Sequence, residues 1–245
     1  MITSPSNPLV KELVRLRSRR HRDTEARFVV EGRTFEQQVI CRELGGEPVV
    51  DAPTVEMSEV AFRKASYRQN PEGVLAIARH LDTSLTKVSL PETPLVLVAE
   101  SIEKPGNVGA MLRTADAGGV DAVVLTGEGT DIHNPNVVRA SQGALFTVAV
   151  GTAAVEELTA WLSENGIRLL AAVPDGGSAP WQVDLTGPVA LAIGAEDEGL
   201  SPALLDAAAG RITIPMLGRV DSLNASTAAA VLVYEAVRQR DSEPD

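Results

Sequence analysis

The sequence predicts an α/β protein whose larger part is a parallel β-sheet with helices packed on it. Continuous apolar runs such as residues 95–99 (LVLVA) are typical of strands that are buried on both faces. These runs alternate along the chain with helix-length segments, which is the pattern of a parallel sheet. Aromatic residues make up only 3% of the chain, whereas small aliphatic residues abound, and this composition suits helices packed closely on a sheet.

Length and composition limit the class of protein. The chain has 245 residues and is 44% hydrophobic, which is enough to bury the core of one large or two small domains. Its single cysteine, Cys41, cannot form an internal disulfide, so we expect a reducing compartment, the cytoplasm. No apolar run reaches membrane-spanning length and the N-terminus lacks a signal-peptide core, so we expect no membrane partner.

Charge is distributed unevenly over a net total of −11. Residues 1–80 carry 13 Lys and Arg against 11 Asp and Glu, whereas residues 81–245 carry 9 against 22. A cluster near the N-terminus holds six cations and one acid, Glu12; the cations are Lys11, Arg15, Arg17, Arg19, Arg20 and Arg22. The cluster is either a solvated helix face or an arm that binds the phosphates of a nucleic acid.

Residues 1–80 are predicted to form a small α/β domain. Asn7 and Pro8 mark a helix start, with Asn7 as the cap and Pro8 in the first turn, and Leu9, Leu13 and Leu16 form its apolar stripe. The elements expected after this helix are a strand at 27–31, a helix at 33–44, a strand at 47–51, a helix at 55–66 and a strand at 74–78. Residues 81–94 are rich in Thr, Ser and Pro and are predicted to be a linker.

Residues 95–245 are predicted to form the larger domain. Its expected strands are 95–99, 122–125, 168–173, 189–193 and 211–214. Its expected helices are 108–117, 153–164, 202–209 and a long last helix that begins at Ala225. A strand that leads through a polar loop into a helix is how open α/β sheets build ligand sites.

The stretch 211–240 has this arrangement of strand, polar loop and helix. Ser222 and Asn224 lie where the last helix begins, beside the positive end of its dipole. Either residue can simply cap the helix. The loop at 216–220 is longer than a cap requires, however, and this favours a binding site.

Two further loops carry polar residues at strand ends. Residues 104–107 (KPGN) lead into the helix that bears Arg113, and residues 193–200 (IGAEDEGL) form an acidic loop bounded by glycines. The acidic loop has no nearby His and no ligand-like spacing, so we expect no metal. No GxGxxG lies between a strand and a helix, which argues against a Rossmann dinucleotide site.

Together these stretches resemble a known family. The segments NVGAMLRTADAGG, IGAEDEGLS and IPMLGRVDSLNASTAAAVLVYEA resemble the three motifs of the SpoU branch (TrmH-like) of the SPOUT RNA ribose 2′-O-methyltransferases, over about residues 95–240. The segments NPLVKELVRLRSRR, FVVEG and NPEGVLAIA are similar to the L30e-like substrate-binding domain of the members that act on rRNA.

The resemblance implies a parallel sheet with a deep trefoil knot, although chains otherwise avoid knots. It also implies a homodimer, S-adenosylmethionine as the cofactor, and methyl transfer to a ribose 2′-hydroxyl of structured RNA, with 23S rRNA as the favoured substrate. A tRNA substrate and a catalytically silent paralogue that binds RNA or cofactor are the alternatives. Lys104 stands where many rRNA-directed members have Asp, which bears on the choice between rRNA and tRNA.

The resemblance also assigns site residues. The cofactor-binding residues implied are Leu125, Thr126, Gly127, Ile193, Gly194, Ile214, Met216 and Leu223. The catalytic residues implied are Asn107, Arg113, Glu196, Ser222 and Asn224. The family assigns the motif-one arginine, Arg113, as the base. Because a guanidinium is not normally deprotonated in a protein, we instead expect Arg113 to grip the target phosphate and to stabilise developing alkoxide charge.

Overall fold

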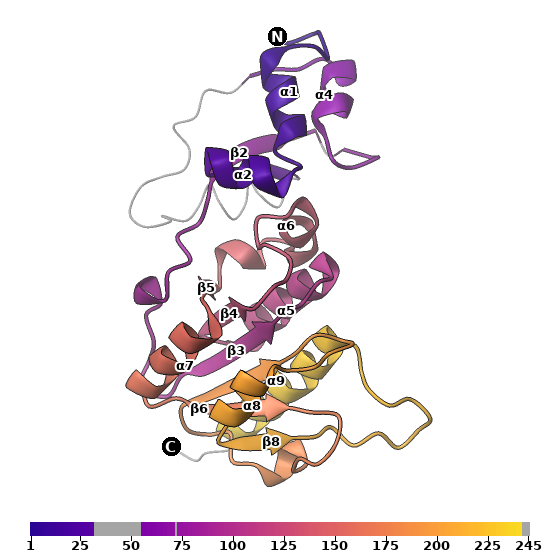
Figure 1. Cartoon of the computed structure of the whole chain (residues 1–245). Coiled ribbons are helices and arrows are strands. Elements are labelled where there is room, and N and C mark those ends of the chain that lie inside the picture. The colour runs from indigo at the N-terminus through magenta and orange to yellow at the C-terminus, as the bar shows by residue number, and fades with distance from the viewer. Residues whose placement is uncertain (32–54, 72, 242–245) are drawn as a thin grey trace. The chain divides into compact units, whose positions relative to one another are not determined.

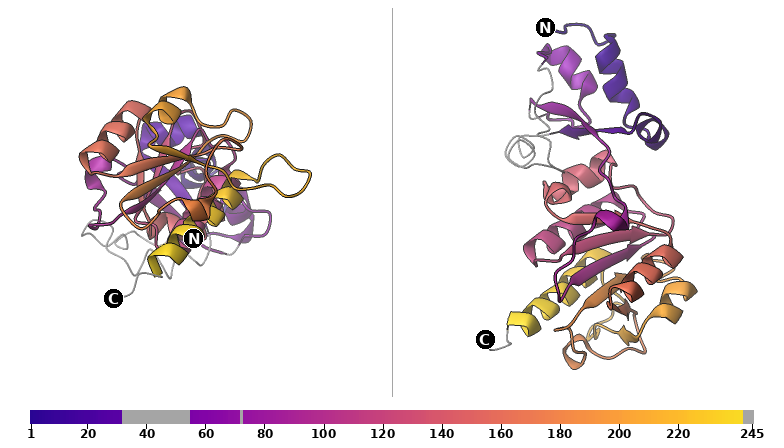
Figure 2. Two further views of the ribbon diagram at one scale, coloured as in Figure 1. Left: turned by 90° about the horizontal axis from the view of Figure 1, so that it is seen from below. Right: turned by 90° about the vertical axis from the view of Figure 1, so that its left-hand side faces the viewer.

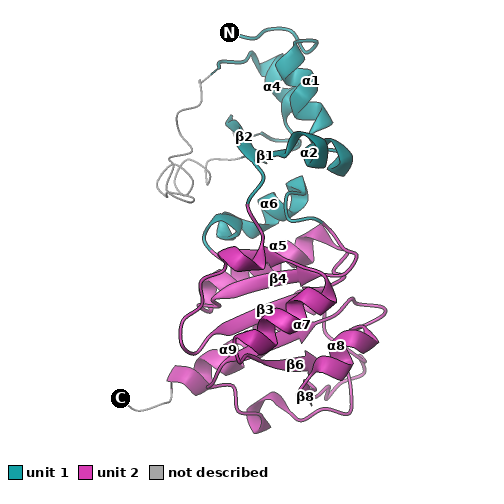
Figure 3. Ribbon diagram, turned by 60° about the vertical axis from the view of Figure 1, so that its left-hand side comes forward, with its two compact units in different colours: residues 1–81, 131–147 teal, residues 82–130, 148–245 magenta. Residues whose placement is uncertain are grey.

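The computed structural model describes residues 1–31, 55–71 and 73–241, which fall into two compact units (Figure 3). Unit 1 consists of Met1–Leu81 and Asp131–Thr147, and unit 2 of Asp82–Thr130 and Val148–Asp245. The helix expected at 33–44, the strand expected at 47–51 and Cys41 lie outside the described residues. The division into domains at 1–80 and 95–245 stays a prediction; by contacts, Asp131–Thr147 groups with the N-terminal residues.

Unit 2 is built on a six-stranded sheet in the order β5-β4-β3-β7-β6-β8, in which each pair of neighbours is parallel (Figure 1). This confirms the parallel sheet expected from the apolar runs. The strands are β3 (Leu95–Glu100), β4 (Ala122–Thr126), β5 (Ala149–Thr152), β6 (Arg168–Ala172), β7 (Val189–Ile193) and β8 (Gly210–Ile212). Every residue of β3 is buried, as expected for a central strand covered on both faces.

The order in which the chain adds strands to the sheet reverses beside β3. From β3 the chain proceeds outward to β4 and β5, and it then returns to the other side of β3 with β6, β7 and β8. Glu100 is paired in register with Thr126, and Ala99 with Ile193, so the carboxyl ends of β3, β4 and β7 lie side by side. The loops that follow these strands therefore meet where open α/β sheets bind their ligands.

Helices cover both faces of this sheet. Figures 1 and 2 show α7 (Val155–Glu164) and α8 (Pro202–Ala207) on one face and α5 (Pro105–Ala117) and α9 (Ala225–Asp241) on the other. Aliphatic side chains of the strands and of α7 and α8 form one buried cluster; among its members are Val96, Val98, Leu158, Leu162 and Leu204. A buried aliphatic layer of this kind holds the strand ends, and hence the loops, in fixed positions.

Unit 1 has its own smaller core. Its elements are α1 (Pro8–Arg15), α2 (Arg19–Glu25), β1 (Arg27–Glu31), α4 (Glu59–Ala65), β2 (Leu75–Arg79) and α6 (Pro135–Ser141). β1 and β2 pair antiparallel, from Arg27 opposite Arg79 to Glu31 opposite Leu75. The predicted cap of α1 is confirmed, because the Asn7 side chain accepts a hydrogen bond from the Leu9 amide at 2.9 Å.

Several elements differ from the expectation. β8 ends at Ile212 and not at Ile214, because the Thr213 amide bonds the carbonyl of Ser178, in a loop, at 2.9 Å. The basic segment near the N-terminus is not one helix: α1 ends at Arg15 and α2 begins at Arg19. β5 and α6 were not predicted, although α6 opens with Asn134 and Pro135, the same start signal as α1.

Candidate functional site

The loops at the carboxyl edge of the unit 2 sheet bring together three of the predicted catalytic residues. Asn107 lies in the first turn of α5, Glu196 in the loop after β7, and Asn224 immediately before α9. Glu196 Oε1 accepts hydrogen bonds from Asn107 Nδ2 at 2.6 Å and from Asn224 Nδ2 at 2.8 Å. Asn224 Nδ2 also lies 3.1 Å from Asn107 Oδ1. One residue from each of the three motif stretches thus contributes to a single side-chain network.

Lys104 joins this network, although it was not predicted as a site residue. Its ammonium group forms an ion pair with Glu196 Oε2. The hydrogen bond from Lys104, followed by that from Asn107, lowers the pKa of the Glu196 carboxyl, and the same pair raises the pKa of Lys104. Glu196 is therefore held as a carboxylate. The signal available in the sequence was the position of Lys104 directly before Pro105 at the start of a helix.

The acidic loop owes its shape to two glycines. A Cβ atom at Gly194 would overlap the backbone of Gly199, so the two segments approach as closely as only glycine permits. Gly199 has a φ of +72°, and it exchanges backbone hydrogen bonds with Ala195 at 3.0 and 3.1 Å. This closes the loop on itself and presents residues 196–198 together.

Glu100 anchors the far side of the same loop. It is 3% exposed, and its Oε2 accepts a hydrogen bond from the Ser201 amide at 2.7 Å. Ser201 in turn caps α8 through the Leu204 amide. The end of β3 is thus connected to the start of α8, which fixes the segment that carries Glu196.

Asn224 is both a helix cap and a member of the network. Its Oδ1 accepts hydrogen bonds from the Ser226 amide at 3.0 Å and from the Ser226 hydroxyl at 2.7 Å, at the start of α9. Its Nδ2 is left to reach Asn107 and Glu196. The two interpretations of this residue are therefore compatible. Ser222 is exposed and makes no side-chain hydrogen bond to any residue that the structure describes.

Arg113 stands apart from the network. It lies on α5 six positions after Asn107, which corresponds to about 9 Å along the helix axis and roughly a third of a turn around it. Its side chain is exposed, and within residues 1–31, 55–71 and 73–241 it has no hydrogen bond or ion pair. A single chain therefore does not bring Arg113 into contact with Asn107, Glu196 and Asn224.

A cleft of about 350 Å³ opens beside the network. This volume is at the lower end of the range of small-molecule sites. Its lining residues are Ser101, Ile102, Glu103, Lys104, Asn107, Glu128, Ala195, Glu196, Asp197 and Glu198. Of the predicted site residues it includes Asn107 and Glu196 and no cofactor-binding residue. No group of His, Cys, Asp and Glu in the described chain is arranged to hold a metal ion.

Five of the residues predicted to hold the cofactor adjoin the lining of this cleft in the chain: Leu125, Thr126 and Gly127 precede Glu128, and Ile193 and Gly194 precede Ala195. The Thr126 hydroxyl at the end of β4 is buried and has no hydrogen-bond partner among the described residues. Gly127 follows with a φ of +71°, and a Cβ there would overlap the Ser101 hydroxyl. The Thr126 hydroxyl without a partner in the described chain, beside the backbone of Gly127, which carries no side chain of its own, fits a ligand that offers hydrogen-bonding groups. Of the others, Ile193 and Gly194 end β7 and begin its loop, and Ile214, Met216 and Leu223 are half-buried before α9.

The basic cluster of unit 1 is only partly exposed. Lys11, Arg15, Arg19 and Arg20 face solvent. Arg22 is 1% exposed, and it pairs with Asp131 at 2.8 Å and donates to the carbonyls of residues 16 and 17. The predicted phosphate contact of Arg22 does not fit this burial, and we remove it from the set. Arg17 is half-buried and donates to the carbonyls of residues 64–66.

Comparison with known proteins identifies the family of this chain. The model of the SpoU rRNA methylase family matches residues 94–234, more than half of the chain. The chain belongs to the SpoU rRNA methylase family. A second model, described as an MRM3-like substrate binding domain, matches residues 7–76. The resemblance carried by the three motif stretches and by the N-terminal segments is therefore confirmed.

Relatives of this SpoU-family chain extend over its whole length. It is 28% identical to a 23S rRNA (guanosine(2553)-2′-O)-methyltransferase of Bacillus subtilis, over 95% of this chain and 97% of that protein. The crystal structure of an RNA 2′-O ribose methyltransferase matches with a TM-score of 0.81 and 40% identity, covering 98% of each chain. An AdoMet-bound rRNA methyltransferase from Sinorhizobium meliloti matches with a TM-score of 0.89 and 28% identity, covering 97% of each chain.

Proposed function

We propose that this chain transfers a methyl group from S-adenosylmethionine to a ribose 2′-hydroxyl of ribosomal RNA, with its target in 23S rRNA. The observation that carries the proposal is the side-chain network of Asn107, Glu196 and Asn224, which joins the three family motifs at the carboxyl edge of the sheet. The names of full-length relatives support the substrate and the cofactor. The N-terminal substrate-binding match supports a large RNA as the partner.

The reaction is an in-line displacement at a methyl carbon. S-adenosylmethionine supplies a methyl group that is already activated by its sulfonium. The 2′-oxygen forms the new C–O bond as the S–C bond breaks, and the hydroxyl proton departs to solvent or to a nearby base. The protein must position the hydroxyl and assist the loss of its proton. Because the donor is already activated, we expect the activity to persist in EDTA.

The network supplies positioning. Asn107 and Asn224 are held by the Glu196 carboxylate, so their amide groups have fixed orientations before substrate arrives. Ser222 lies in the loop before Asn224, where its exposed hydroxyl is free to contact the ribose. Arg113 presents an exposed guanidinium that suits a forked contact to a phosphate and that can stabilise the negative charge developing on the attacking 2′-oxygen as it loses its proton.

We also propose that the active site is completed by a second copy of the chain. Within one chain Arg113 is separated from Asn107 by about 9 Å along α5, so it does not reach the network. A homodimer in which Arg113 of one subunit faces the network of the other would remove this separation.

The trefoil knot of the C-terminal segment and a cytoplasmic location are also part of the proposed function. None of the described helices is long and apolar enough to cross a membrane.

Mapping 2′-O-methylation tests the function directly. The RNA is isolated from cells that lack this protein and is then incubated with the purified protein. We expect one additional methylated ribose in 23S rRNA and none in tRNA. Arg113→Ala should abolish this methylation and leave the affinity for S-adenosylmethionine within a few-fold by isothermal titration. Arg113→Lys should also be poor, because an ammonium cannot make a forked contact.

Four results would contradict the proposal. Methylation found only in tRNA would assign the alternative substrate. Binding of cofactor without any methylation would indicate a silent paralogue. Full activity of Arg113→Ala would remove Arg113 from the site, and an active monomer in sedimentation would reject the dimer.

A further inference from the structure

Unit 1 carries an exposed aromatic ring that is held in place by polar contacts. Tyr67 follows α4 and is 42% exposed. Its backbone amide donates to Glu31 Oε2 at 2.9 Å, and its hydroxyl accepts from Asn136 Nδ2 of α6 at 3.1 Å. A ring fixed at both its backbone and its hydroxyl has little freedom left to lose when something stacks on it.

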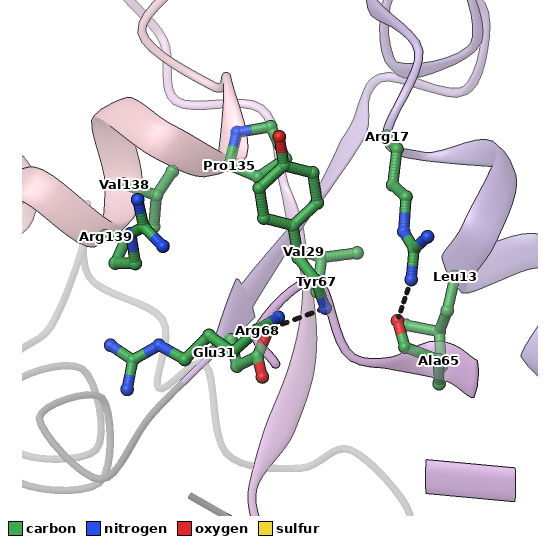
Figure 4. Close-up of a pocket in the computed structure, with 10 residues that line it drawn as sticks. All are labelled: Leu13, Arg17, Val29, Glu31, Ala65, Tyr67, Arg68, Pro135, Val138 and Arg139. Atoms are coloured by element: carbon green, nitrogen blue, oxygen red, sulfur yellow. Dashed lines mark hydrogen bonds between the residues drawn. The ribbon is translucent and has the colours of Figure 1, made fainter. Parts of the chain in front are cut away.

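Cations surround this ring. The Arg17 guanidinium lies 5.8 Å from the ring centroid, within the range of a cation–π contact. Figure 4 shows the Tyr67 ring between the side chains of Arg17 and Arg139, with Arg68 nearby. Arg139 is exposed, and its guanidinium makes no hydrogen bond or ion pair with the residues that the structure describes.

One carboxylate, that of Glu31, is among the residues that line the hollow beside the Tyr67 ring, and its oxygens already accept other hydrogen bonds. Glu31 accepts hydrogen bonds from the Ser66 hydroxyl and from the Tyr67 and Arg68 amides. Its oxygens are thus occupied by the turn that carries Tyr67. The lining residues are Leu13, Arg17, Val29, Glu31, Ala65, Tyr67, Arg68, Pro135, Val138 and Arg139. An exposed ring with the exposed Arg139 guanidinium beside it, and with the half-buried Arg17 and Arg68 nearby, matches a ligand that has both a flat π-face and negative charge.

The size of the hollow restricts how such a ligand can lie. It measures about 20 Å³, which is room for about one water molecule. A nucleobase cannot enter it, so the ligand must lie over the ring. Stacking on an exposed aromatic side chain, with cations beside it for the backbone, is how proteins hold unpaired nucleotides.

We propose that Tyr67, Arg68 and Arg139, together with Arg17, form a binding site for an unpaired nucleotide of the RNA substrate. We call these residues the Tyr67 platform. The nucleobase stacks on the Tyr67 ring, and the exposed Arg139 guanidinium contacts the phosphate beside it. This inference rests on the proposed function for the identity of the partner as RNA. It adds Tyr67, Arg68 and Arg139 to the RNA contacts of unit 1 and shares Arg17 with the basic cluster near the N-terminus.

The test separates stacking from charge by salt dependence. Binding of protein-free 23S rRNA is measured by filter retention over a range of KCl concentrations. Tyr67→Ala should weaken binding roughly 5- to 150-fold, the loss expected for one stacked base, with an unchanged log–log salt slope. Arg139→Gln should reduce that slope by roughly 0.7 to 0.9 units, because one phosphate contact is lost. Tyr67→Phe keeps the ring but loses the hydrogen bond from Asn136, so it should bind much closer to wild type than Tyr67→Ala does.

Two variants serve as matched controls. Trp181→Ala removes an exposed aromatic side chain of unit 2, and Arg63→Gln removes an exposed arginine of unit 1. Both should retain wild-type affinity and slope. The proposal is overturned if Tyr67→Ala binds like wild type, or if it lowers the salt slope as Arg139→Gln does, since the ring would then act only by positioning cations. Site-specific methylation by the wild type, measured in parallel, shows whether the proposed function itself stands.

Discussion

At the scale of single residues, Lys104 and Glu196 form an ion pair beside the amide groups of Asn107 and Asn224. Lys104 is largely exposed, and an exposed ion pair contributes little to the stability of the fold. Its effect is therefore local. It keeps the Glu196 carboxyl ionised, and the ionised group accepts the hydrogen bonds that orient both asparagines.

Removing this cation should shift the pH dependence of catalysis. In Lys104→Met the pKa of Glu196 rises from its lowered position towards the ordinary range, because the largest cause of the lowering is gone. The carboxylate is then lost at a higher pH as the solution is acidified. We expect the acidic limb of the kcat/KM profile for methyl transfer to move to higher pH, while wild type keeps its activity further into acid. The matched control is Lys87→Met, an exposed lysine of the same unit. Superimposable profiles would show that Lys104 does not act through Glu196.

The resemblance of the sequence to the family could identify Asn107, Glu196 and Asn224, because each lies in one of the three motif stretches. It could not show that they bond to one another, since this depends on the register of β3, β4 and β7. Nor could it show that Arg22 is buried, because this depends on a contact between residues far apart in the chain, Arg22 and Asp131. The separation of Arg113 from Asn107, by contrast, follows from their spacing of six positions on one helix.

At the scale of elements, the buried strands were the most predictable parts of the fold. β3 and β7 are continuous apolar runs, and they lie where expected. β5 has only four residues at the sheet edge, and such a short segment carries little periodicity. α6 packs with β1 although more than a hundred residues separate them, and no local pattern indicates this.

The segment before α6 introduces a buried histidine into unit 1. His133 is 7% exposed and stacks on His80 with ring centroids 3.9 Å apart, while Phe28 lies 4.7 Å away. Its Nε2 accepts a hydrogen bond from the Leu81 amide at 3.0 Å. Burial, aided by His80, lowers the pKa of His133 to about 4.

This lowered pKa predicts a loss of stability in mild acid. The unfolded chain binds a proton at about pH 6.5 and the folded chain only at about pH 4, so unfolding becomes more favourable as pH falls through this window. The loss reaches at most about 3 kcal/mol from His133. Burial also lowers the pKa of His80, which therefore acts in the same direction.

Hydrogen exchange in β1 and β2, corrected for intrinsic rates, should reveal this loss of stability between pH 7 and pH 5. His133→Gln keeps an acceptor without titrating and should lose most of this dependence; an unchanged dependence would point to other groups.

At the scale of the whole molecule, the charge distribution separates two tasks. Residues 81–245 are strongly acidic, and the cleft beside the network is lined by five carboxylates and one lysine. A polyanion gains little from such a surface. We therefore expect RNA to obtain most of its electrostatic attraction elsewhere, and propose the exposed cations of α1 and α2 as its source.

Neutralising Lys11, Arg15 and Arg20 together tests whether this cluster holds RNA phosphates. All three are exposed, unlike Arg22, so their replacement by glutamine leaves the core of unit 1 intact. Each lost phosphate contact lowers the log–log salt slope of RNA binding by roughly 0.7 to 0.9 units, and we expect the three effects to add. The affinity for S-adenosylmethionine, by titration calorimetry, should not change, because the predicted cofactor residues all lie in unit 2. The control replaces Lys87, Arg168 and Arg211 of unit 2, which gives the same net charge. If both triple variants keep the wild-type slope, the cluster is only a solvated helix face. If both lower the slope equally, net charge and not the cluster governs the attraction.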